Sequence, residues 1–247
     1  MSNVLLMGES WFTYSVHQKG FDAFYTSEYI EGAQHFIDVL RAAGHSVDYI
    51  PAHLIDSKLP ETAAELAQYD VIAISDVGAN TFQLPSAAFT KSIASVDKSE
   101  TVRQYVENGG SVLMIGGYLT FSGIDAKARW GRSPLAAALP VSILDIDDRV
   151  ELPAGSAARV VAEHSAVAGL DAVWPNLLGF NEVVAKSEST VLAEIDGHPL
   201  LVVGTYGQGR SAAFTSDIAP HWAPPSFMEW AGYPVLFDQL VRWLSEK

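Results

Sequence analysis

The segment VENGGSVLMIGGYLTFSG, residues 106–123, carries the strongest indication of the fold. Residues 111–115 form a short apolar run of the kind found in strands that are buried on both faces, as in a parallel sheet. Gly116 and Gly117 follow, and a glycine pair permits a tight turn or a close approach of the backbone to a ligand. In open parallel sheets, ligands bind beyond the carboxyl ends of the strands. The segment therefore predicts a ligand site at which Tyr118 stands where a catalytic nucleophile is expected.

The first half of the chain alternates between strands and helices around this segment. Strands are expected at residues 3–7, 46–50, 71–75 and 111–115. Helices are expected at residues 30–43, 61–67 and 98–108. Residues 12–29, which are rich in aromatic side chains, are interpreted as a long loop over the sheet. Strands and helices that alternate at this spacing predict an α/β fold with a doubly wound, mostly parallel sheet, helices on both faces and right-handed crossovers.

The second half of the chain is expected to be largely antiparallel. After a helical piece within residues 125–139, strands are expected at residues 141–150, 158–161, 181–195, 200–203 and 210–215. Asp196-Gly197 is a hairpin turn signal, and residues 207–209 mark a second turn. These features predict a C-terminal antiparallel β-meander that extends or flanks the sheet, followed by an amphipathic helix at residues 233–244. No linker is evident, so we expect a single domain over residues 1–247 with an elaboration at about 124–180.

The composition excludes several kinds of protein. The net charge of −14 disfavours nucleic acid and anionic membrane surfaces as partners, because phosphate binding needs clustered Lys and Arg. No apolar run reaches the roughly 18 residues of a membrane span. The N-terminal residues MSNVLLMGES lack the basic region and cleavage site of a signal peptide, so we expect a cytoplasmic protein. The absence of cysteine removes disulfides, thiolate metal sites and cysteine nucleophiles. The histidines show no metal-ligand spacing, so neither a metal nor another cofactor is expected.

Polar residues gather after four of the expected strands, where a parallel sheet places them beside one another. The candidate catalytic residues are Glu9, Tyr118, Asp217 and His221. The candidate substrate-binding residues are Ser10, Trp11, Asp76, Asn80, Gly116, Gly117, Ser216 and Trp222. Carboxylate and imidazole groups suit acid–base chemistry when burial tunes their pKa values. Trp and Tyr side chains suit the apolar faces of sugars or flat rings, so the pattern predicts a pocket for a small-molecule ligand.

Structural roles account for several of these residues equally well. Tyr118 also suits a purely structural role, as a packed residue of the pocket wall whose hydroxyl is hydrogen-bonded. Asp76 and Asp217 each suit the cap of a following turn or helix, and Asn80 suits a turn. His221 fits an ordinary loop histidine. The sequence leaves the functional and the structural interpretation of these side chains open.

Three segments of the chain resemble a known family. They are YDVIAISDVGAN at residues 69–80, GGSVLMIGGY at 109–118 and HPLLVVGTYGQGRSAAFTSDIAPHW at 198–222. They are similar to the putative glutamine amidotransferase family, a branch of the class I glutamine amidotransferase-like superfamily that is related to the ThuA-like proteins. The resemblance runs from Val4 to about Leu244. It implies a flavodoxin-like α/β fold with an active-site elbow after the central strand.

The resemblance also implies which catalytic groups are missing. In working class I amidotransferases the elbow carries a nucleophilic cysteine, and a later strand is followed by a histidine and a nearby glutamate. Tyr118 occupies the elbow here, His221 matches the histidine, and Ala223 stands where the glutamate is expected. A phenol with a pKa near 10 does not replace a thiolate in amide hydrolysis at neutral pH. We therefore expect no release of ammonia from glutamine by the Cys-His-Glu route.

Two hypotheses follow from different classes of function. The first is an enzyme without a thiol intermediate, a hydrolase, isomerase or lyase acting on a small polar metabolite such as a carbohydrate derivative. The carbohydrate rests on the ThuA-like resemblance and on the aromatic residues. The alternative is a non-catalytic binding or oligomerisation module of the same fold, with exposed aromatics in residues 12–29 or 224–230 as the interface of a homo-oligomer.

Overall fold

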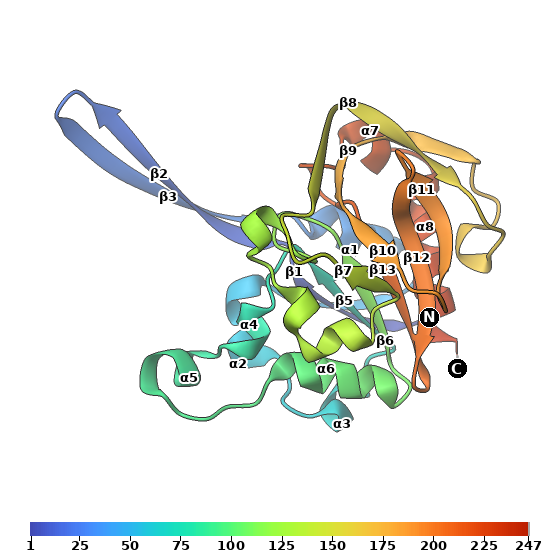
Figure 1. Ribbon diagram of the computed structural model, residues 1–247, viewed down its shortest axis with the longest axis horizontal. Coiled ribbons are helices and arrows are strands. Elements are labelled where there is room, and N and C mark those ends of the chain that lie inside the picture. Colours follow the sequence, from blue (N-terminus) through green and yellow to red (C-terminus); the bar gives the residue numbers. More distant parts are fainter. Residues whose placement is uncertain (247) are drawn as a thin grey trace.

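A mixed sheet of nine strands forms the centre of this computed structural model, which describes residues 1–246 (Figure 1). Its strand order is β4-β1-β5-β6-β13-β12-β11-β8-β9. The first five strands are parallel: β4 Ser46–Ile50, β1 Asn3–Gly8, β5 Val71–Ser75, β6 Ser111–Ile115 and β13 Gly209–Phe214. The other four are antiparallel: β12 His198–Tyr206, β11 Thr190–Ile195, β8 Arg149–Val160 and β9 Val173–Asn181. The predicted α/β fold is confirmed, and the antiparallel strands extend the same sheet.

Both faces of the parallel half are covered, which explains its uninterrupted apolar strands. On one face, α1 Gln34–Ala42 and α8 Gly232–Ser245 join an apolar cluster that contains Leu113 of β6. On the other face, α6 Lys98–Glu107 joins a second cluster that contains Val112. Successive side chains of a strand point to opposite faces, so neighbouring residues of β6 enter different clusters. Within residues 1–246, no helix is long and apolar enough to cross a membrane.

Short helical segments complete the two layers. The α-helical ones are α2 Ile55–Lys58, α3 Ala63–Leu66, α4 Asn80–Gln83, α5 Ser86–Lys91 and α7 Pro225–Met228. Two further 3₁₀ helices are η1 Ala52–Leu54 and η5 Ser165–Val167. Of the two aromatic residues at 224–230, Phe227 is fully buried and Trp230 is half-buried, so this segment offers little of the exposed aromatic surface that was expected there.

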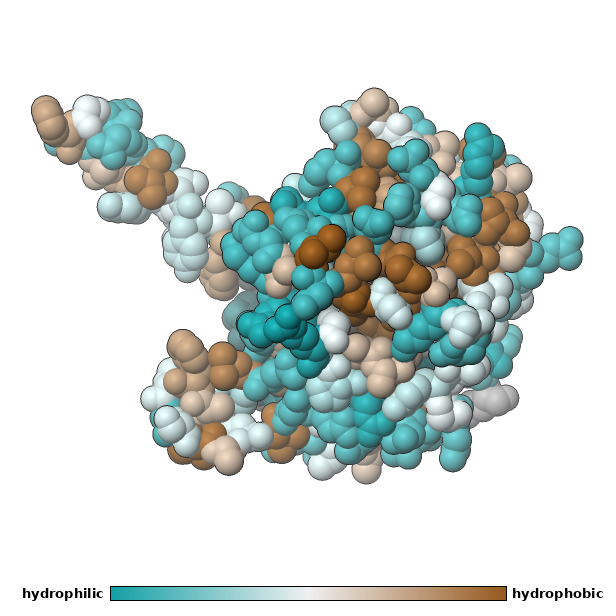
Figure 2. Space-filling model, viewed as in Figure 1, coloured by the Kyte–Doolittle hydropathy of each residue, from teal (hydrophilic) through white to brown (hydrophobic). Residues whose placement is uncertain are grey.

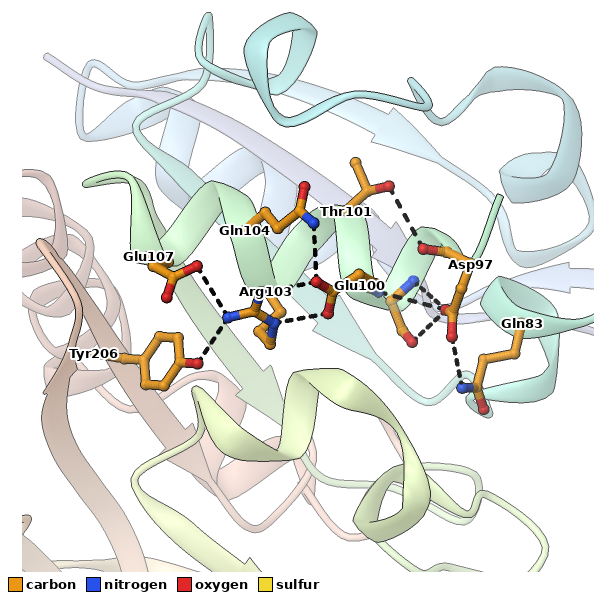
Figure 3. A network of polar contacts seen from close by, with 9 residues as sticks. Gln83, Asp97, Glu100, Thr101, Arg103, Gln104, Glu107 and Tyr206 are labelled. Atoms are coloured by element: carbon orange, nitrogen blue, oxygen red, sulfur yellow. Dashed lines mark hydrogen bonds and ion pairs between the residues drawn. The ribbon is translucent and has the colours of Figure 1, made fainter. Parts of the chain in front are cut away.

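Polar contacts fix helix α6 beneath the central strand. Asp97 caps its N-terminus by accepting hydrogen bonds from two amides of the first turn, and its other oxygen accepts a 3.0 Å bond from Gln83 of α4 (Figure 3). Arg103 pairs with Glu100 at 2.7 Å and donates a 2.8 Å hydrogen bond to the Tyr206 hydroxyl of β12 (Figure 3). These bonds connect α6 both to α4 and to the antiparallel strands.

Residues 12–29 form a β-hairpin, so the loop interpretation of this segment is wrong. β2 Ser10–Lys19 pairs with β3 Asp22–Glu31 in an antiparallel two-stranded sheet. The turn between them contains Gly20, whose φ of 63° is the left-handed conformation that glycine supplies without steric cost. The β-branched and aromatic residues of this segment favour extended strands, which is the physical reason for the hairpin. Because β3 includes residues 30 and 31, helix α1 begins at Gln34 rather than at residue 30.

The elaboration differs in detail from the prediction. The helical piece at 125–139 consists of three 3₁₀ helices, η2 Ile124–Ala126, η3 Trp130–Arg132 and η4 Pro134–Ala137. The strand predicted at 141–150 is interrupted. β7 Val141–Ile143 pairs with β10 Val183–Ala185 in a small separate sheet, and β8 begins at residue 149. The interruption has a physical cause, because Asp147 and Asp148 accept hydrogen bonds from amides of residues 122–125 and leave the sheet to do so.

Candidate functional site

The carboxyl ends of β1, β5, β6 and β13 meet at one edge of the sheet, around a pocket of about 390 Å³. The residues that line it are Glu9, Trp11, Asp76, Tyr118, Asp217, Pro220 and His221. Six of them come from the connections after β1, β5, β6 and β13, and Trp11 is the second residue of β2 Ser10–Lys19. The sheet therefore brings together one or more residues from each of the four clusters that the sequence singled out.

The two glycines after β6 allow a close approach of the backbone to neighbouring strands. A Cβ atom on Gly116 would lie 2.2 Å from the carbonyl oxygen of Thr215, and one on Gly117 would lie 2.7 Å from Oδ1 of Asp76. The Gly117 amide donates a 3.0 Å hydrogen bond to Oδ1 of Asn181. Contact between the strand ends therefore accounts for the glycine pair, and Tyr118 is delivered to the pocket as a consequence.

Glu9 is a buried carboxyl group directly after β1. It is 1 % exposed, and its Oε2 accepts a 2.6 Å hydrogen bond from the Ser75 hydroxyl. Its backbone φ of 45° is uncommon for a residue other than glycine. Burial, followed by the charges of Asp217 and Asp76, raises the pKa of Glu9 well above its ordinary value. The site therefore favours the protonated, uncharged form of Glu9.

Asp76 occupies the corresponding position after β5. Its φ is 39°, and its Oδ1 accepts a 2.7 Å hydrogen bond from the Leu119 amide, so it does cap the turn of the elbow. Burial and the neighbouring Asp217 raise the pKa of Asp76 to about 6, although the Leu119 amide and His221 act in the opposite direction. Glu9 and Asp76 thus combine positive φ angles with raised pKa values, a combination that is typical of functional sites.

Asp217 uses its two carboxylate oxygens differently. Oδ1 accepts hydrogen bonds from the amides of Ile218 at 2.7 Å and Ala219 at 3.0 Å, which caps the turn after β13. Oδ2 lies 3.6 Å from Nδ1 of His221. Asp217 is buried, whereas about a third of the His221 side chain is exposed. The carboxylate therefore lies beside the imidazole and faces its Nδ1, the arrangement in which a carboxylate orients a histidine ring.

Tyr118 presents its ring to His221, with the ring centres 3.9 Å apart and the planes at 85°. Its hydroxyl donates a 2.9 Å hydrogen bond to Oε1 of Glu151, and the Arg149 guanidinium lies 4.9 Å from the ring centre. Burial and then Glu151 raise the pKa of Tyr118, so the nucleophilic phenolate is less accessible than in a free tyrosine. Trp222 is 1 % exposed, and its indole donates to the other oxygen of Glu151 at 3.1 Å.

Glu151 of β8, Asp148 just before β8 and Asn181 of β9 support the site and were not among the predicted residues. Glu151 joins Tyr118 to Trp222, as described above. Asp148 accepts hydrogen bonds from the amides of residues 122 and 123 and from the side-chain amide of Asn181. Charged and apolar residues alternate at 149–152, which indicates a strand with one polar face. This pattern could have identified Glu151 as a candidate site residue.

Four of the predicted substrate-binding side chains lie outside the pocket lining. The Ser10 hydroxyl accepts a hydrogen bond from the Ala52 amide at 2.9 Å, and the buried Ser216 hydroxyl donates to a carbonyl oxygen of β9 at 2.8 Å. Asn80 is exposed at the first residue of α4. Trp222 lies behind the pocket wall, in ring contact with Tyr118. Of the eight predicted substrate-binding residues, Trp11 and Asp76 are the two that line the pocket.

The charges of the pocket restrict the ligands that suit it. Its lining contains three carboxyl groups and neither lysine nor arginine. An anionic ligand would face this acidic lining with His221 as its one group able to carry positive charge, so a neutral or cationic polar molecule fits better. Among residues 1–246, no three His, Asp or Glu side chains are arranged to hold a metal ion.

The comparisons with known proteins agree with this architecture. The model of the family described as "Putative glutamine amidotransferase" matches residues 3–246. The structure of cytoplasmic protein STM3548 from Salmonella typhimurium is similar over 100 % of both chains, with 44 % sequence identity and a TM-score of 0.97. That of cytoplasmic protein STM1381 from Salmonella typhimurium LT2 is similar over 99 % of this chain and 100 % of that chain, with 45 % identity and a TM-score of 0.96.

A more distant structure has the same fold. It is a putative thua-like protein from Parabacteroides merdae ATCC 43184, similar over 99 % of this chain and 90 % of its own, with 12 % identity and a TM-score of 0.60. The search of curated proteins finds no match.

Proposed function

Since the chain belongs to the putative glutamine amidotransferase family but has Tyr118 at the elbow, we propose that its pocket serves a different chemistry. The pocket binds a small polar metabolite, neutral or cationic, such as a carbohydrate derivative, and transforms it by acid–base catalysis without glutaminase activity. The observation that carries this proposal is the meeting of Glu9, Asp217 and His221 in one pocket. We also place the protein in the cytoplasm, because its two Salmonella relatives are named cytoplasmic proteins.

The proposed roles follow from the position of His221 beside Asp217 and from the raised pKa of Glu9. His221, oriented by Asp217, takes a proton from a substrate hydroxyl group or from water. Glu9, which is held in its protonated form, gives a proton to the oxygen atom on which negative charge develops. This division of an acid and a base between two groups suits hydrolysis, isomerisation or elimination.

The remaining lining residues bind and orient the ligand. The indole of Trp11 and the ring of Tyr118 supply flat apolar surfaces, which suit the C–H faces of a sugar ring. Asp76 has one carboxylate oxygen bonded to the Leu119 amide, which leaves the other for a ligand hydroxyl. Tyr118 is assigned to binding rather than to nucleophilic attack, because its hydroxyl is bonded to Glu151 and its pKa is raised.

A thermal-shift screen tests the binding part of the proposal. The panel contains neutral sugars, sugar acids, amino acids including glutamine, nucleotides and divalent metal ions. A ligand at about 100 times its dissociation constant adds roughly 2.7 kcal/mol of stability, which is readily measured. We expect stabilisation by a neutral or cationic polar compound and none by sugar acids or nucleotides. Silence across the whole panel, with an intact melting transition, contradicts the proposal and favours the non-catalytic alternative.

Turnover of the compound that binds tests the catalytic part. His221→Ala should abolish turnover, while His198→Ala, which removes a partly exposed histidine paired with Glu182, serves as the matched control. Tyr118→Phe should keep most of the turnover, because the ring stays in place. Unchanged turnover in His221→Ala would refute the assigned roles.

A further inference from the structure

The β2–β3 hairpin, residues 10–31, projects from the body as an arm with no second layer of structure along most of its length (Figure 1). Its described contacts with the body lie at its base, where Phe12 and Tyr29 approach the ring of His53. An isolated two-stranded hairpin is at best marginally stable in water. The hydrogen bonds between β2 and β3 therefore do not by themselves explain why the arm is a stable extended hairpin.

The strand register divides the arm into two unlike faces. Residues paired directly across an antiparallel ladder share a face, and successive residues alternate between faces. One face carries Phe12, Tyr14, Val16, Tyr25 and Tyr29, which we call the aromatic face. It has no charged residue beyond Glu31 at the base of the arm. The opposite face, which we call the polar face, carries the remaining charged residues of the arm, Lys19, Asp22 and Glu28, together with Trp11, Phe24 and Ile30.

The aromatic face is exposed and continues into the body. Tyr14 is 77 % exposed and Tyr25 is 76 % exposed. At its base the face joins a groove of about 380 Å³, whose lining includes Phe12, Tyr29 and the exposed side chains Leu84 and Phe89. Figure 2 shows hydrophobic side chains both on the arm and, across an open notch, around α5. The arm and the α4–α5 segment thus form two sides of one apolar notch.

We propose that this notch is the docking surface for a second copy of the chain, with the two arms crossing aromatic face on aromatic face. At about 200 Å² for a large aromatic side chain, the aromatic face together with Leu84 and Phe89 exposes roughly 800 Å². A stable interface of standard size takes about 800 Å² from each partner. The notch alone therefore supplies the area that a two-fold dimer needs.

The distribution of charge favours a second copy of this chain as the partner that binds in the notch. A two-fold interface places the same patch on both sides, so a charged patch repels itself. With a net charge of −14, most of this surface is unsuited to self-association, whereas the aromatic face carries almost no charge. The same face also has side chains that both donate and accept hydrogen bonds, namely its tyrosines, Gln18 and Ser27. Such groups pair with the equivalent groups of a second copy across a two-fold interface.

Sedimentation velocity over a wide range of protein concentration tests the proposal without any ligand. We expect the wild-type protein to sediment with twice the monomer mass. The double substitution Tyr14→Ser/Tyr25→Ser on the aromatic face should reduce this to the monomer mass. The matched control is His17→Ser/Phe24→Ser, which removes two stacked rings from the polar face and should leave the dimer intact. A wild-type monomer at every concentration, or equal behaviour of the two double variants, overturns the proposal.

A cross-linking measurement keeps the test valid if a variant arm does not fold. The chain has no cysteine, so a single introduced cysteine reports on one position. With a short bifunctional maleimide, Val16→Cys on the aromatic face should give cross-linked dimers, and the neighbouring Ser15→Cys on the polar face should give few. The reverse result refutes the arrangement. A monomer that floats with phosphatidylcholine vesicles refutes it as well and assigns the aromatic face to a lipid surface.

Discussion

The pocket edge of the sheet and the β2–β3 arm are neighbours in the chain, yet their side chains are held in opposite ways. Glu9, the residue before the arm, is 1 % exposed and bonded to the adjacent strand, whereas Tyr14 is 77 % exposed. Around the pocket, hydrogen bonds join the residues that follow β1, β5 and β6 to one another and to β9 and β13. The hydrogen-bond ladder of the arm, in contrast, joins β2 and β3 only to each other. Changes at the pocket edge should therefore affect the stability of the whole fold, and changes on the arm should affect association.

The largest expected contrast is between two tryptophans. Trp222→Ala should lower the free energy of unfolding by about 3–5 kcal/mol, because it leaves a cavity and removes the indole that donates to Glu151. Trp11→Ala, at the base of the arm and 36 % exposed, should cost about 1 kcal/mol. Urea unfolding followed by far-UV circular dichroism measures both. Equal losses would mean that Trp11 is as much a part of the core as Trp222.

Substitution of one glycine in each region compares how tightly the two backbones are packed. Gly116→Ala places a Cβ 2.2 Å from the Thr215 carbonyl oxygen and should cost about 3 kcal/mol, since neither main-chain segment can move without disturbing the sheet. Gly20→Ala in the arm turn meets no atom within 4 Å, so its cost is the strain of a φ of 63°, about 1 kcal/mol. Thermal denaturation of both variants gives the difference. A Gly116→Ala protein as stable as Gly20→Ala would contradict the packing described for the elbow.

The pH dependence of stability gives a third contrast. Burial raises the pKa of Asp76 to about 6, above the value of about 3.9 for an unfolded aspartate. The folded state therefore holds a proton that the unfolded state releases, and this contribution to stability is intact below pH ~4 and is lost as the pH rises through about 6. Asp76→Asn removes the titrating group, while its amide oxygen still accepts from the Leu119 amide.

The stability of the Asp76→Asn protein relative to wild type should rise between pH ~4 and ~7, on the order of 2 kcal/mol. Urea unfolding at a series of pH values measures this. The control is Asp22→Asn, which removes an exposed carboxylate from the arm. A relative stability of Asp76→Asn that stays constant over this pH range, or falls, would show that burial of Asp76 does not disfavour its charged form.

The same contrast explains what could be predicted from the sequence. Strands 71–75 and 111–115 were predicted with their observed ends, because burial on both faces leaves a continuous apolar run. Five residues that were predicted from their positions after the strands do line one pocket: Glu9, Asp76, Tyr118, Asp217 and His221. Their positions follow from the local sequence pattern and from the general geometry of parallel sheets, so they could be predicted without knowledge of tertiary contacts.

The site residues that were not predicted depend on contacts between segments far apart in the sequence. Glu151 contacts Tyr118 across 33 residues of sequence, from strand β8, which lies between β11 and the edge strand β9. The arm was misread for the opposite reason. Neither face of the arm packs against the core of the chain, so its sequence lacks the alternation of buried apolar and exposed polar residues that indicates a strand. Its exposed aromatic residues were therefore interpreted as a loop.

The smallest expected effect is on the polar face of the arm. His17→Ser/Phe24→Ser removes a stacked pair with ring centres 4.4 Å apart that touches no core residue among those described, so it should change the free energy of unfolding by no more than about 0.5 kcal/mol. Native-state hydrogen exchange adds a residue-level test, because amides in the outer half of the arm should exchange in the variant while those of β6 stay protected. A loss of stability near that of Trp222→Ala would mean that the arm and the sheet unfold as one cooperative unit. In that case the division between a pocket edge that carries stability and an arm that carries association would be wrong.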